Sequence, residues 1–311
     1  MTKGLGRGWK IGHWTDANAR TGCTVVLPPR GNVCSCDIRG SSPSSRELPH
    51  LDPDRRLTEV HGILLTGGSA FGLAAADGVM SWLEEHRIGY ETRAALVPIV
   101  PAAVILDLGT GSSEVRPGAE QGRLACDAAQ EGVPDTGAVG AGTGATVGKW
   151  AGFEHAAPGG FGFAEARQEG ARAAAVAVVN SVGDVLAEDG SVIAGSSAPR
   201  GALPFSSGAA AAPESDVPTQ PPSPATNTVL AVVAVEGTLD KRDVRWLAAR
   251  GSDGVTVAVR PAHTRYDGDV TFALATPPPP GAPPADLDIL GVLATAAVAA
   301  AVRAAVSPPG H

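Results

Sequence analysis

The chain has 311 residues, 43% of them hydrophobic, so it can bury the core of one large domain or of two. Its formal net charge of −8 argues against a nucleic-acid partner, because phosphates require a basic protein face. Aromatic residues make up only 4% while glycines number 40, so we expect a core of Ala, Val and Leu on closely packed backbones.

The two ends of the sequence indicate a cytoplasmic protein with no membrane partner. Residues 1–6 lack the apolar stretch of a secretion signal. An Ala/Val-rich run at 289–306 is long enough to suggest a membrane span, but Arg303 interrupts it and alanine is only weakly hydrophobic. We therefore predict a buried terminal helix there.

The cysteines give no sign of a metal centre. Cys34 and Cys36 alternate within a strand-like run, but no histidine or second cysteine pair completes a zinc spacing around them. We expect buried thiols and no metal at all four cysteine positions, which are Cys23, Cys34, Cys36 and Cys126.

Strands and helices alternate irregularly along the chain. Apolar and β-branched runs predict strands at 23–27, 33–38, 60–66, 171–180, 185–188, 228–235, 255–260 and 270–275. Helical spacing predicts helices after 67–72 up to about 86, at 120–131, from 239 to about 251, and after a proline-rich linker at 277–284. Such a mixture favours an α+β fold, with sheets that carry helices on their outer faces.

Two glycine-rich turns resemble known active-site loops without completing them. Ser69 stands where a nucleophile elbow has its serine, but Phe71 replaces the last glycine of that motif, so Ser69 is predicted to cap a helix. Lys149 ends a run that resembles a phosphate-binding loop, but Thr143 and Trp150 stand where a glycine and a magnesium-binding hydroxyl are required. The sequence therefore predicts no nucleotide and no other cofactor.

The sharpest boundary in the sequence is the peptide bond between Asn227 and Thr228. A segment rich in Pro, Ser, Ala and Gly at 196–226, predicted to be flexible, ends there, and an uninterrupted apolar strand begins. Self-cleaving chains place Ser, Thr or Cys at such a bond, because the freed residue supplies a hydroxyl or thiol and an α-amine of pKa about 8 that can act as base. An ordinary strand that follows a linker gives the same pattern, so both interpretations stand at this point.

Three other positions can serve a nucleophile at Thr228. Asp267 and Asp269 flank a glycine; one carboxylate can hold the freed amine while the other orients the first, or the three residues can form a hairpin turn. Asn180 ends a strand and can donate to an oxyanion or cap a turn. Lys149 can stabilise developing negative charge, or simply face solvent.

Taken together, these positions resemble the DmpA-type aminopeptidases, a family that includes the β-peptidyl aminopeptidases and the nylon-oligomer hydrolase NylC. The resemblance covers nearly the whole chain except 196–226. It is carried by His13-Trp14-Thr15-Asp16, Leu65-Thr66-Gly67-Gly68-Ser69-Ala70-Phe71-Gly72-Leu73, Val97-Pro98-Ile99-Val100-Pro101-Ala102-Ala103-Val104-Ile105, Gly140-Ala141-Gly142-Thr143-Gly144-Ala145, Asn227-Thr228, and His263-Thr264 with Asp267-Gly268-Asp269.

The resemblance implies an autoprocessing hydrolase in a single αββα four-layer sandwich. Cleavage would divide this domain into an α part, residues 1–227, and a β part, residues 228–311, and the family commonly forms tetramers of such heterodimers. Thr228 corresponds to the nucleophile and Asn180 to the amide beside it. Lys149, Asp267 and Asp269 correspond to the charged residues around the nucleophile in the nylon-hydrolase branch.

Two positions depart from the family pattern. Val229 stands where a second threonine often follows the nucleophile, which leaves the chemistry intact. Leu106 stands where several members have a tyrosine, so a hydroxyl contact on the substrate side is missing and their specificity does not carry over.

The expected activity is that of an aminopeptidase that attacks small peptides or amides through Thr228. The substrate would carry a free amine, which suits the acidic first part of the chain. Hydrolysis of 6-aminohexanoate oligomers is the second hypothesis, and acyl transfer by the same chemistry is the third. From another class, an uncleaved, non-catalytic assembly protein is also possible on the sequence alone.

Overall fold

The computed structural model describes residues 3–199, 227–281 and 284–307. Of the segment predicted to be flexible, 196–226, the part from residue 200 onward lies outside the described residues.

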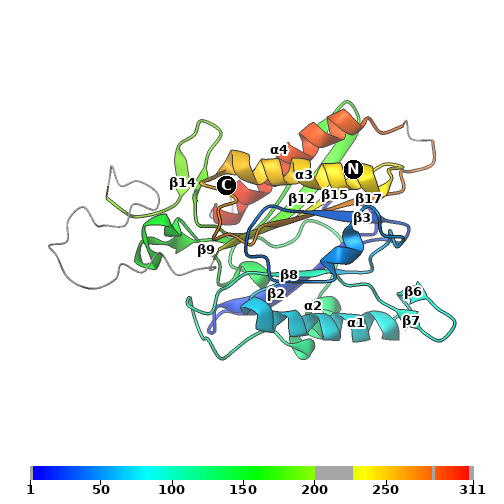
Figure 1. The fold of residues 1–311 in the computed structure, drawn as a ribbon, viewed down its shortest axis with the longest axis horizontal. Helices are drawn as coiled ribbons and strands as arrows, with labels where there is room; N and C mark the ends of the chain where they lie inside the picture. Colours follow the sequence, from blue (N-terminus) through cyan, green and yellow to red (C-terminus); the bar gives the residue numbers. More distant parts are fainter. Residues whose placement is uncertain (1–2, 200–226, 282–283, 308–311) are drawn as a thin grey trace.

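Two five-stranded sheets form the centre of the molecule (Figure 1). In the first sheet, the strands lie in the order β1 (Lys10–Asp16), β2 (Thr21–Leu27), β5 (Ile63–Thr66), β8 (Ala102–Val104) and β4 (Ser45–Arg46). In the second sheet, the order is β11 (Gly160–Gln168), β12 (Ala171–Asn180), β15 (Thr228–Glu236), β17 (Val270–Thr276) and β3 (Val33–Ile38). The second sheet therefore combines strands from both sides of the bond between residues 227 and 228.

Helices cover the outer face of each sheet. Figure 1 shows α1 (Ala75–Glu85) and α2 (Ala119–Asp127) on the first sheet, and α3 (Lys241–Ala258) and α4 (Leu287–Val306) on the second. The layers follow one another as helices, sheet, sheet and helices, which confirms the predicted αββα sandwich.

The remaining elements are short. The 3-10 helices are Leu48–Leu51, Ser69–Ala74, Gly140–Gly142, Lys149–Ala151 and Phe153–His155, and the small strands are β6 (Tyr90–Glu91), β7 (Leu96–Val97), β9 (Thr146–Val147), β10 (Ala157–Pro158), β13 (Asp184–Leu186), β14 (Val192–Ala194) and β16 (Val259–Arg260).

The period of two along β15 decides which side chains face which layer. Val229, Val233 and their odd-numbered neighbours pack against α3 and α4. Leu230 and Val232 enter the core between the two sheets. Because successive side chains of a strand point to opposite faces, Thr228 belongs to the face between the sheets. All three apolar interfaces consist mainly of Ala, Val and Leu, as the composition predicted.

The predicted strand at 255–260 is wrong for most of its length, because α3 continues to Ala258 and only Val259–Arg260 is extended. Val244, Leu247, Gly251 and Val255 are buried at helical spacing and pack on the second sheet and α4. This packing outweighs the low helix propensity of the β-branched residues.

The predicted helix cap at Ser69 is also wrong. Gly68, with φ 80°, precedes a 3-10 segment that begins at Ser69, and Ser69 makes no capping hydrogen bond. The α-helix itself begins only at Ala75. The glycine turn therefore leads into a tight 3-10 segment and not directly into the helix.

The terminal helix and the cysteines agree with the predictions. Helix α4 is long and apolar enough to cross a membrane, but it lies packed on β11 and β12 with half of its 20 residues buried. All four cysteines are buried free thiols.

Phe272→Ala should lower the free energy of unfolding by about 3–5 kcal/mol, because the ring of Phe272 is completely buried between the sheets and its loss leaves a cavity. Urea denaturation followed by circular dichroism measures this change. Phe153→Ala is the control, since Phe153 is 46% exposed and its truncation should have little effect. Equal losses in the two variants would contradict the placement of this core.

Candidate active site

The register of β12 and β15 places Asn180 directly opposite Thr228. The two strands are antiparallel, so the Cα atoms of such a pair lie about 4.5–5.5 Å apart. Asn180 lies two residues after Val178, and Thr228 lies two residues before Leu230, so both belong to the face between the sheets, where Val178 and Leu230 are buried. Both polar side chains are buried, where the last residue of one strand meets the first residue of the next.

The hydroxyl of Thr228 lies against the carbonyl group of the preceding residue. Thr228 Oγ1 donates to the carbonyl oxygen of Asn227 at 2.5 Å. The same oxygen accepts a hydrogen bond from the backbone N–H of Gly268 at 2.9 Å. The hydroxyl of the candidate nucleophile and a backbone hydrogen-bond donor therefore meet at one carbonyl oxygen, so the hydroxyl lies beside the carbonyl group that an acyl transfer would attack.

The turn at 267–269 is fixed to both sides of this peptide bond. Asn227 forms a parallel bridge with Asp267, and Asp269 Oδ1 accepts a hydrogen bond from the N–H of Val229 at 2.6 Å. Asp269 Oδ2 lies 2.7 Å from His263 Nδ1. Asp269 thus binds the backbone of Val229 and the ring of His263. It makes no hydrogen bond to Asp267, so the predicted arrangement in which one carboxylate orients the other is not the one observed among the described residues.

Asp267 has one oxygen with a partner and one without. Its Oδ2 accepts from the N–H of Thr264 at 2.7 Å, while its buried Oδ1 has no hydrogen-bond partner among the described residues. Burial and the charge of Asp269 raise the pKa of Asp267 to about 6. A buried acceptor of this kind suits an ammonium group.

Lys149 is buried, contrary to the usual position of a lysine at the surface. Gly148 turns the chain inward with φ 72°, and a Cβ atom there would lie 2.2 Å from the nitrogen of Ser196. Lys149 Nζ donates to Asn180 Oδ1 at 2.9 Å and to the Asn180 carbonyl oxygen at 3.1 Å. Burial lowers the pKa of Lys149 to about 7, against the opposing effect of Asp267.

Asn180 joins Lys149 to the strand of the nucleophile. Its Oδ1 accepts from Lys149 and from the N–H of Thr146 at 3.0 Å. Its Nδ2 donates to the carbonyl oxygen of Leu106 at 3.4 Å. The amide predicted to bind an oxyanion is therefore directed toward Leu106, while Gly268 supplies the donor to the Asn227 carbonyl.

The structure brings together all of the residues that the sequence singled out, namely Asn227, Thr228, Asn180, Lys149, Asp267 and Asp269. Their catalytic roles stay predictions. Sequence reasoning missed Gly268 as a backbone donor and His263 as the partner of Asp269. The only signal for either was their place in the family motifs at 263–264 and 267–269. The described residues hold no group of His, Cys, Asp and Glu arranged to bind a metal ion.

The fold and the site define a hydrolase whose candidate nucleophile is the first residue of a central strand. The chain matches peptidase family S58 over residues 7–308. An uncharacterized aminopeptidase of Mycobacterium tuberculosis is 41% identical over 312 residues, covering 94% of this chain and 88% of its own length. A 6-aminohexanoate-oligomer endohydrolase of an Agromyces species is 29% identical over 275 residues, covering 86% of this chain and 73% of its own.

Solved structures agree on the fold. A β-aminopeptidase from a Burkholderia species superposes with a TM-score of 0.67 at 20% identity, covering 96% of this chain and 84% of that one. The L-aminopeptidase D-Ala-esterase/amidase of Ochrobactrum anthropi, a variant of the Ntn-hydrolase fold, superposes with a TM-score of 0.67 at 18% identity, covering 96% of this chain and 83% of that one.

The chain belongs to peptidase family S58. The resemblance to the DmpA-type aminopeptidases is confirmed, and the protein is a hydrolase of peptide or linear amide bonds. Membership of this family argues against the hypothesis that the chain is a non-catalytic assembly protein.

Gly268→Ala should slow any reaction at the Asn227 carbonyl by roughly ten- to a hundredfold. The new Cβ atom would lie 2.7 Å from the Ser42 carbonyl oxygen and 2.9 Å from Thr228 Oγ1, so the turn and the nucleophile must shift. The measurement is the rate at which the 31.2 kDa chain is cleaved, followed by electrophoresis.

Gly109→Ala is the matched control for Gly268→Ala, because a Cβ atom at Gly109 meets no atom within 4 Å. A Gly268→Ala chain that reacts at the same rate as this control would contradict the proposed importance of the turn.

Proposed function

We propose that the protein is an autoprocessing aminopeptidase that cleaves its own Asn227–Thr228 bond and then uses Thr228 as an N-terminal nucleophile. The observation that carries this proposal is the contact of Thr228 Oγ1 with the Asn227 carbonyl oxygen, at 2.5 Å, together with the Gly268 N–H on the same oxygen. An ordinary strand that follows a linker needs neither contact.

Self-cleavage proceeds in two steps. Thr228 Oγ1 attacks the carbonyl carbon of Asn227, and the charge that develops on the carbonyl oxygen is stabilised by the N–H of Gly268. The C–N bond then breaks, the hydroxyl proton is delivered to the departing nitrogen, and an ester links Asn227 to Thr228 Oγ1. Water hydrolyses this ester, leaving a carboxylate on Asn227 and a free amine and hydroxyl on Thr228.

The mature enzyme repeats the chemistry on a substrate amide. The Thr228 amine takes the proton of its own hydroxyl and returns it to the leaving group, and water resolves the acyl-enzyme. The unpartnered Oδ1 of Asp267 is the acceptor available to the new ammonium group. Lys149 is held by Asn180, which lies opposite Thr228; while Lys149 is protonated, its charge disfavours a second positive charge nearby and so favours the neutral form of the amine that acts as base.

Intact mass spectrometry tests the self-cleavage. We expect two products, residues 1–227 and 228–311, from the wild-type chain. Thr228→Ala should remain whole and inactive because it has no hydroxyl, while Thr228→Ser should still be cleaved because it keeps one. A wild-type chain that stays whole at 31.2 kDa while hydrolysing substrate would refute the proposal, and so would an active Thr228→Ala chain.

For the substrate, we propose a small peptide or amide with a free N-terminal amine. The relatives at 40% identity and above are named aminopeptidases, whereas those named 6-aminohexanoate-oligomer endohydrolases are 29% identical. The acidic excess before residue 228, 24 Asp/Glu against 17 Lys/Arg, suits the ammonium group that either substrate carries. Hydrolysis of 6-aminohexanoate oligomers is therefore the second candidate.

Parallel assays of an amino-acid p-nitroanilide and a 6-aminohexanoate oligomer separate the two candidates. We expect the larger kcat/KM for the p-nitroanilide, and the reverse order would favour the second candidate. Added amines test acyl transfer, because a transferase would form the amide of the acceptor in preference to the free acid. A homotetramer of α/β heterodimers and a cytoplasmic location remain predictions.

A further inference from the structure

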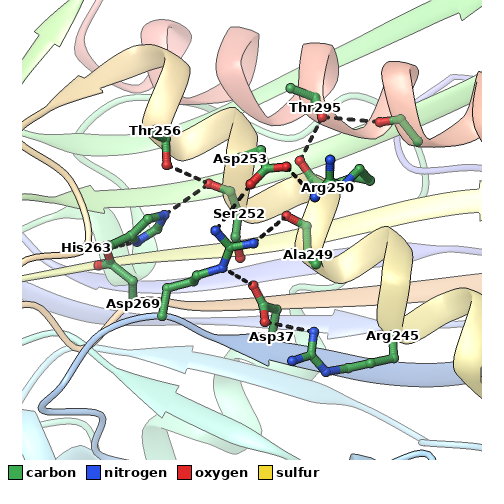
Figure 2. Close-up of polar contacts among 12 residues, drawn as sticks. Asp37, Arg245, Ala249, Arg250, Ser252, Asp253, Thr256, His263, Asp269 and Thr295 are labelled. Atoms are coloured by element: carbon green, nitrogen blue, oxygen red, sulfur yellow. Dashed lines mark hydrogen bonds and ion pairs between the residues drawn. The ribbon is translucent and has the colours of Figure 1, made fainter.

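His263 is a largely buried histidine next to the site, with both ring nitrogens engaged. Nδ1 lies 2.7 Å from Asp269 Oδ2, and Nε2 lies 3.1 Å from the carbonyl oxygen of Ser252 on α3 (Figure 2). The histidine side chain is 13% exposed and the Asp269 side chain 4%.

These contacts indicate the protonation state of the pair. A carbonyl oxygen only accepts, so His263 Nε2 must carry a proton toward Ser252. An unprotonated Nδ1 and a carboxylate oxygen can each only accept a hydrogen bond. Their close contact therefore requires a second proton, which lies between Nδ1 and Asp269 Oδ2. With a proton on each nitrogen, the ring is an imidazolium that neutralises a carboxylate buried beside Asp267.

The other oxygen of Asp269 binds the backbone of β15, the strand that begins with Thr228. Asp269 Oδ1 accepts from the N–H of Val229 at 2.6 Å, one residue beyond Thr228. A continuous chain of hydrogen bonds therefore runs from α3 through His263 and Asp269 to the backbone that carries the nucleophile.

His263 does not itself serve as the general base for Thr228. Its Nε2 is occupied by α3, which packs on the helix-covered face of the sheet, whereas Thr228 belongs to the opposite face. Any influence of His263 on the reaction must therefore pass through Asp269.

We propose that His263, as an imidazolium, is a positioning residue that holds the Asp269 carboxylate against the Val229 N–H and thereby fixes Thr228 for self-cleavage. This inference rests on the proposed self-cleavage. It predicts that the rate of self-cleavage falls when the His263 ring loses its proton, although the ring touches no reacting atom.

The charged surroundings determine the direction of the pH dependence. Burial and Arg39 work against the imidazolium, but the hydrogen bond and charge of Asp269 outweigh them, so the pKa of His263 is raised above its usual value. On α3, Asp253 follows Ser252 in the sequence and is paired with Arg39 and Arg250 (Figure 2). The positioning is therefore complete below the raised pKa and is lost as the pH rises through it.

His263→Gln tests the proposal. Glutamine can donate one hydrogen bond to Asp269 but does not titrate, so we expect self-cleavage to slow by roughly ten- to a hundredfold and its alkaline decline to disappear or shrink. Lys149 also titrates near neutral pH, and the part of the decline that it causes survives in His263→Gln. His86→Gln, at an exposed histidine on the far helical layer, is the control and should match the wild type.

Nitrogen-15 NMR of the Thr228→Ala chain provides a readout that does not depend on activity and is made on a chain that keeps His263. We expect one histidine with both ring nitrogens protonated at neutral pH, absent from the double variant Thr228→Ala/His263→Gln. A neutral His263 ring, or a His263→Gln chain with the wild-type rate and pH profile, overturns the inference. A wild-type chain that is not cleaved at any pH refutes the self-cleavage itself.

Discussion

The site depends on the position of β15 between β12 and β17. The strand pairs antiparallel with β12 and parallel with β17, so its first residue meets the last residue of one neighbour and the turn that precedes the other. This single arrangement brings Asn180 opposite Thr228 and places the N–H of Gly268 on the Asn227 carbonyl oxygen. A slip of one residue would turn the side chain of Thr228, the candidate nucleophile, to the face covered by helices and separate it from these partners.

The same arrangement concentrates charge where little water can screen it. Lys149, Asp267 and Asp269 are all at least 96% buried, so each is costly unless an opposite charge or a hydrogen bond compensates it. Asn180 and the turn at 264–269 provide this compensation, with the histidine paired to Asp269. Burial also disfavours the charged form of each group, which is why the pKa of Lys149 is lowered and that of Asp267, next to the charge of Asp269, is raised, both toward neutrality.

Much of this site was accessible from the sequence because strand ends are visible in composition. The apolar runs that stop at Asn180 and start at Thr228 are those of β12 and β15, the glycine run before Lys149 drew attention to that residue, and the family resemblance implied the roles of Lys149 and the acidic turn. Which atom of each residue faces the nucleophile was not accessible. The carboxamide of Asn180 can point either way, and a backbone N–H such as that of Gly268 leaves no trace in residue type. The predicted end of α3 is too early for a related reason, since the apolar run at 255–260 fits a buried helix end as well as a strand.

The loop that leaves β3 explains why the acidic turn can be held so tightly. The N–H of Ser42 donates to the Asp267 carbonyl oxygen at 3.0 Å, and the N–H of Arg39 donates to that of Asp269 at 3.1 Å. The loop then enters the other sheet as β4, where the N–H of Val104 donates to the Ser44 carbonyl oxygen at 3.2 Å. Because one segment is bonded to the turn and to both sheets, the spacing of the sheets and the position of the Gly268 donor are set together. The four-layer packing therefore acts through this loop on the position of the Asn227 carbonyl group, and a substitution between the sheets can disturb the candidate site without touching it.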